Sequence, residues 1–97
     1  MSGPSVEAQA AVAVQLIDEA LRKPPAEARE EVDVAERAVV VLRDRLIDEL
    51  RAGADRRALL DRVNAALSLI AGVEYPVAKF QRRPLEQARD LLLGLGA

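Results

Sequence analysis

Carboxylates are the most numerous side chains here that could take part in acid–base or metal chemistry. The chain has sixteen Asp and Glu residues, no histidine and no cysteine. Without histidine it lacks the commonest general base and metal ligand at neutral pH. Without cysteine it lacks thiolate nucleophiles, disulfides and Cys-ligated zinc. A di-metal carboxylate bundle needs Glu-x-x-His pairs. We therefore expect no metal and no cofactor.

The remaining candidates for catalysis do not form a recognisable site. Adjacent acids occur at Glu30–Glu31 and Asp48–Glu49, near helix ends or on faces expected to be solvated. Ser68 has no base at helical spacing, and no Gly-rich phosphate loop follows a strand. These observations predict a protein that is not an enzyme.

Residues 75–84, YPVAKFQRRP, contain the chain's only tyrosine and only phenylalanine. Tyr75 and Phe80 are the largest side chains in a connection that must cross one end of a bundle, so they could close the core. The same residues, with Arg82 and Arg83, could instead anchor a protein partner, because Tyr and Arg are typical hot-spot residues. Both interpretations stay open.

The C-terminal half is basic and offers a second interpretation of this segment. Residues 55–97 hold seven basic and five acidic side chains, whereas residues 1–54 hold seven and eleven. Basic residues beside aromatics can hold phosphates and stack bases. Nucleic-acid modules usually carry a clear excess of Lys and Arg, which a chain of net charge −2 lacks. We keep a nucleic-acid-binding regulator as the alternative, although we regard nucleic acid as an unlikely partner.

The elements that would position these residues are all predicted to be helices. Apolar residues recur at the i, i+3, i+4, i+7 spacing of amphipathic helices, and no stretch alternates as a strand would. Ser5 is a suitable N-cap, Gly53 a suitable C-terminal stop, and Asp55 an N-cap for the next helix. Pro25 and Pro84 suit first helical positions. The predicted fold is an all-α, small antiparallel bundle of four helices, at about 5–22, 25–52, 56–71 and 84–93.

The second helix is predicted to be the long spine of the bundle. Its apolar seam is spaced 4-3-4-3-4, which favours shallow packing against its neighbours; the seam consists of Ala28, Val32, Ala35, Val39, Leu42 and Leu46. Short connections make neighbouring helices antiparallel. Alanines at positions 10, 13 and 20 would allow the first helix to approach the spine closely.

A second apolar stripe on the spine suggests a partner surface. The run AVVVL at residues 38–42 is apolar around nearly the whole helix, and such a helix is normally covered on all sides. Val40 and Ile47 lie away from the main seam, beside Glu36 and Arg43. A symmetric dimer would match Glu36 of one chain with Arg43 of the other. The third or fourth helix could equally cover this stripe from within the chain.

The composition favours a protein that associates with other chains over one that catalyses a reaction. The 97 residues are expected to form a single helical-bundle domain, 1–97, which is 51% apolar but only 2% aromatic. A small aliphatic core often gains further burial by oligomerising. The sequence predicts a non-enzymatic protein-interaction module, such as an accessory subunit, adaptor or small regulator, that binds itself as a homodimer, another protein, or both. A bundle around a small apolar ligand is a third possibility.

Neither a signal peptide nor a membrane span is indicated, so we expect a cytoplasmic protein.

Overall fold

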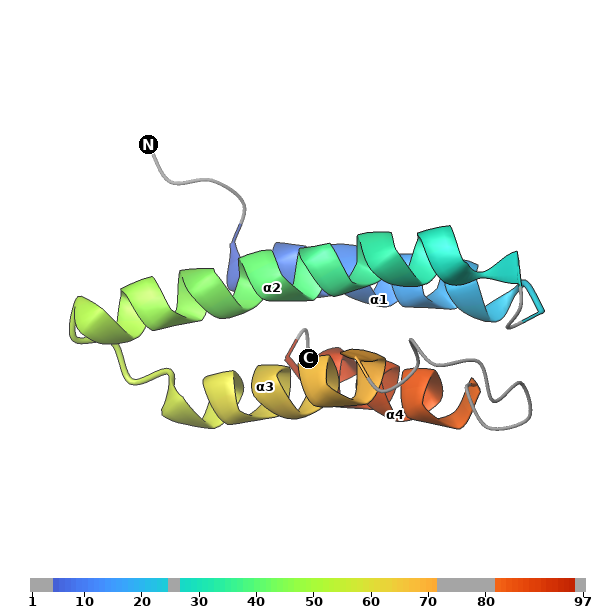
Figure 1. The fold of residues 1–97 in the computed structure, drawn as a ribbon. Coiled ribbons are helices and arrows are strands. Elements are labelled where there is room, and N and C mark those ends of the chain that lie inside the picture. Colours follow the sequence, from blue (N-terminus) through green and yellow to red (C-terminus); the bar gives the residue numbers. More distant parts are fainter. Residues whose placement is uncertain (1–4, 25–26, 72–81, 96–97) are drawn as a thin grey trace.

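Within the residues that the structure describes, the chain folds into four α-helices. The computed structural model describes residues 5–24, 27–71 and 82–95. The helices are α1 (Val6–Leu21), α2 (Arg29–Arg51), α3 (Arg57–Ala71) and α4 (Arg82–Leu93), and no strand occurs within those ranges (Figure 1). The predicted all-α bundle is confirmed.

The helices pack in two layers, α1 with α2 and α3 with α4 (Figure 1). Each helix packs against two neighbours, because α2 also contacts α3 and α1 also contacts α4. With 23 residues, α2 is the longest element, and it runs unbroken along a molecule of 42 × 22 × 20 Å. It is therefore the spine that the seam predicts.

The ends of α1 and α2 follow local rules. The Ser5 hydroxyl accepts a hydrogen bond from the Ala8 N–H at 3.1 Å, so Ser5 is the predicted N-cap. Just beyond the C-terminal end of α2, Gly53 has φ +100°, a conformation that favours glycine. The Gly53 N–H donates to the Leu50 carbonyl, and the Ala54 N–H donates to that of Glu49. This pair of bonds is a Schellman motif, and it stops the spine.

All four helix starts differ from the sequence prediction, by one to four residues, and α1 begins one residue late, at Val6. The spine begins at Arg29, not residue 25, because the Glu27 N–H donates to the Pro24 carbonyl and closes a separate turn first. α3 begins at Arg57, one residue late. α4 begins two residues early, at Arg82, so Pro84 is its third residue. Proline is tolerated at this position, because backbone N–H groups in the first turn of a helix have no carbonyl partner within the helix and the missing N–H of proline costs no hydrogen bond.

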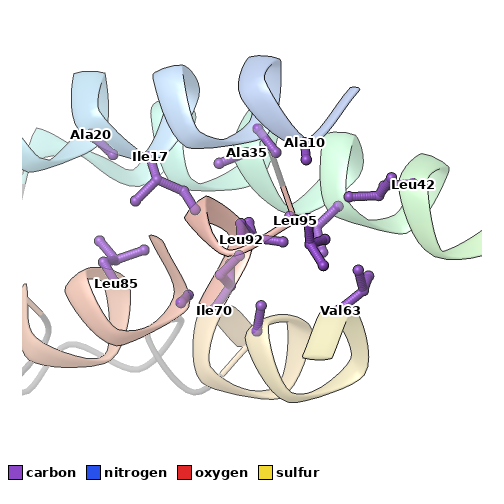
Figure 2. Packing of buried hydrophobic residues seen from close by; sticks show 14 of the residues in the cluster. Ala10, Ile17, Ala20, Ala35, Leu42, Val63, Ile70, Leu85, Leu92 and Leu95 are labelled. Atoms are coloured by element: carbon purple, nitrogen blue, oxygen red, sulfur yellow. The ribbon is translucent and has the colours of Figure 1, made fainter. Parts of the chain in front are cut away.

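The core is aliphatic and lies between the two layers. Buried side chains from all four helices point into one interior (Figure 2), and the largest fully buried ones include Ile17, Leu42, Leu46, Ile70 and Leu92. The buried residues of α1 and α2 include alanines at positions 10, 13, 20 and 35. Their small size lets the two helices approach closely.

Candidate docking surface

Three exposed valines mark the outer surface of the α1–α2 layer. Val12 is 52% exposed, Val34 44% and Val41 55%, although each belongs to a well-packed helix. We call these three residues the valine patch. The only other large apolar side chain as exposed among the described residues is Leu93 in α4, which belongs to the other layer.

On α2 the two valines lie on the flank that faces α1. At 100° per residue, Val34 and Val41 point in nearly the same direction, about 10 Å apart along the helix. They share the side of the buried seam that carries Glu31. Glu31 accepts a hydrogen bond from Lys23, two residues beyond α1, at 2.8 Å. Their side of α2 is the one next to α1, because Asp18 and Arg89 place α4 on the other flank of α1, and in antiparallel right-handed helices α3 then lies on the other flank of α2.

On α1, Val12 lies on the side next to α2. Asp18 pairs with Arg89 of α4 at 3.3 Å, which marks the flank of α1 that faces α4. Val12 lies on the opposite side of the buried row from Asp18, about 130° from the centre of that row. The three valines therefore share the surface of the α1–α2 layer that faces away from α3 and α4.

Half-buried apolar residues and charges surround the valine patch. Leu16 and Ala38 pack against the core and form its floor. At 100° per residue, five charged residues lie around the rim of the valine patch: Glu19, Glu30, Arg37, Arg45 and Asp48. An apolar centre with a polar rim is the usual anatomy of a protein–protein contact.

The predicted stripe lies on the other flank of α2. Glu36, Val40, Arg43 and Ile47 are all half-buried, on the side away from α1 and toward α3. Arg43 also pairs with its neighbour Asp44 at 3.2 Å. The chain itself thus covers part of this stripe. A partner contact through it stays a prediction.

The aromatic segment lies outside the described residues, and with it Tyr75 and Phe80. Whether they close the core or anchor a partner therefore stays a prediction. Arg82 is the first residue of α4, and its side chain is not described. Arg83 follows it on α4 and is exposed.

Several basic side chains of the C-terminal half serve the fold itself. Arg56 donates to Glu49 of α2 at 2.9 Å, and Arg89 donates to Asp18 of α1. The Arg62 guanidinium lies against Gly94, where the C-terminal end of α4 carries partial negative charge. Each of these three arginines contacts a different element: α2, α1 and the C-terminal end of α4.

The shifted ionisable groups belong to ion pairs that join elements. A hydrogen bond from Lys23 lowers the pKa of Glu31, and in return the pKa of Lys23 is raised. The pKa of Glu49 is lowered by its hydrogen bond from Arg45, together with Arg56. The pKa of Arg89 is raised by its bond to Asp18. Such pairs position helices and do not resemble a poised acid and base.

The described part of the chain holds no group of three or more Asp, Glu, His or Cys residues that could bind a metal ion. Within it, no helix has both the length and the apolar character that a membrane span requires.

Comparison of the chain with protein-family models, curated proteins and solved structures found no match.

Proposed function

We propose that this chain is a non-enzymatic protein-interaction module that docks through the valine patch. The observation that supports the proposal is the position of Val12, Val34 and Val41, about half exposed, on one surface of two adjacent helices. Single exposed apolar residues are common on protein surfaces, but a group with a charged rim is typical of a binding site.

The energetics favour a modest contact. Removing the exposed half of a valine from water is worth roughly 1 kcal/mol. Three valines hold a partner only weakly, so Leu16, Ala38 and the rim must also contribute. An accessory subunit, an adaptor and a small regulator all fit this strength of binding. The cytoplasm stays the compartment expected from the sequence.

Nothing in the described residues favours the nucleic-acid alternative. Arg56 and Arg89 are engaged in ion pairs, and Arg62 lies at the end of α4. Phosphate binding depends on several cations along one face, so we do not propose it.

Site-specific photo-crosslinking tests the docking surface. A benzophenone amino acid is introduced at position 12, or at position 93 as a control on an equally exposed apolar site. We expect an adduct from position 12 in cells that express the protein, and its loss when Val41→Glu is added. An adduct from position 12 that survives Val41→Glu, or equal adducts from positions 12 and 93, would contradict the proposal.

A further inference from the structure

We infer that the partner on the valine patch is a second copy of this chain, packed antiparallel about a two-fold axis. The inference rests on the proposed function, since it names the occupant of the same surface. A two-fold contact requires a self-complementary surface, on which residue i meets residue j of the partner and j meets i. α2 carries such a surface.

Four residues form a symmetric row along the outer side of α2. Glu30, Val34, Val41 and Arg45 lie within about 60° of one another around the helix. Their spacing is 4-7-4, so the inner pair and the outer pair share one midpoint, between residues 37 and 38. The inner pair is apolar, and the outer pair is one acid and one base.

A two-fold axis at that midpoint pairs every member of the row favourably. Val34 meets the partner's Val41, and Glu30 meets the partner's Arg45. A parallel pairing in register would put Glu30 against Glu30 and Arg45 against Arg45. Arg45 already binds Glu49 at 3.0 Å, but a guanidinium has five donors and can serve two carboxylates. Charge complementarity therefore favours the antiparallel copy.

α1 fits the same axis. Along the bundle, Ala35 lies between Ile17 and Ala10 (Figure 2). Because α1 and α2 run in opposite directions, residues near Val12 are then roughly level with residues 37 and 38 of α2. A two-fold axis that lies in the plane of contact and passes over both helices at this level puts Val12 against Val12 of the partner. All three valines are then covered at once.

One residue opposes this arrangement. Arg37 is exposed and close to the midpoint, so it approaches its own symmetry mate across the axis. Like charges this close weaken association. Arg37→Ala should therefore tighten the dimer several-fold, an effect that an unrelated partner has no reason to show.

Disulfide trapping tests the pairing directly, because the chain has no cysteine of its own. Val34→Cys and Val41→Cys are oxidised gently, each alone and as an equimolar mixture, and dimers are counted on a non-reducing gel. In the antiparallel pair, two copies of one position lie about 10 Å apart along the helices, beyond the roughly 7 Å that a disulfide spans between Cα atoms. We expect the mixture to crosslink at least several-fold more than either variant alone. Val12→Cys should crosslink with itself, and Leu93→Cys should not.

The outcomes separate this inference from the proposed function. Dimers of Val34→Cys alone that form as readily as those of the mixture would overturn the antiparallel pairing. Absence of any disulfide from positions 12, 34 and 41 would overturn the second copy. If the photo-crosslink from position 12 then still depends on Val41, the docking surface stands with a different occupant. If that crosslink is absent as well, both proposals fail.

Discussion

Small residues determine how closely α1 and α2 pack. Ala10, Ala13 and Ala35 are 1% exposed or less, in two helices that pack against each other. The burial of these alanines was predictable, because they follow the apolar spacing of the first helix and of the spine. Gly53 has a different role: because it has no β-carbon, it can adopt φ +100° and end the spine.

Enlarging one of these alanines should destabilise the fold. Ala13→Leu inserts three carbons between α1 and α2, and overpacking of this kind costs about 1–3 kcal/mol. The free energy of unfolding, from urea titration, measures the loss. Ala11→Leu makes the same change at an exposed position of α1 and should change stability by less than about 0.5 kcal/mol. Equal effects of the two substitutions would mean that the helices are not in close contact at Ala13.

At the scale of elements, α2 is joined to its neighbours by ion pairs at both ends. Lys23 and Glu31 link it to the end of α1, and Glu49 links it to Arg56, just before α3. All four side chains are partly exposed, so salt screens these pairs. They define the positions of the connections more than they stabilise the fold.

These pairs predict how stability depends on pH. In the folded chain the pKa of Glu49 lies below its ordinary value of 4.5, because the carboxylate accepts hydrogen bonds from Arg45 and Arg56. The stabilisation is complete above that ordinary value and is lost as pH falls through the lower, folded value. Glu49→Gln should therefore reduce the fall in urea midpoint between about pH 6 and pH 3.

Asp61→Asn, at an exposed position of α3, is the matched control and should keep the wild-type acid response. A Glu49→Gln variant whose midpoint falls as much as that of the wild type would rule out this role for the two arginine contacts.

The sequence predicted the elements, but it did not predict which residues of the spine are exposed. Heptad spacing identified the buried seam of α2, because one helix alone determines which residues share a side. It could not identify which valine of the run at residues 38–42 is exposed. That depends on which flank of α2 is covered by α1 and which by α3, and only the assembled bundle determines it. The signal for the exposed surface that the sequence did contain was Val34 and Val41, two valines that are seven residues apart and lie outside the buried seam.

At the scale of the whole molecule, two thin layers share one aliphatic core. The apolar residues between the layers are buried, whereas the outer surface of the α1–α2 layer keeps the valine patch. With only 2% aromatic residues, each core contact is small. A second chain on that surface would cover both α1 and α2 from outside and extend the burial that one chain provides.

Sedimentation velocity over a range of concentrations tests self-association through this surface most directly. We predict a reversible dimer for the wild type and a monomer for Val41→Glu, whose unfolding midpoint measured on the monomer should change little, because position 41 is exposed. Leu93→Glu makes a comparable change on α4 and should remain a dimer. A wild type that sediments as one chain at every concentration, or a Val41→Glu variant that dimerises as before, would contradict the account.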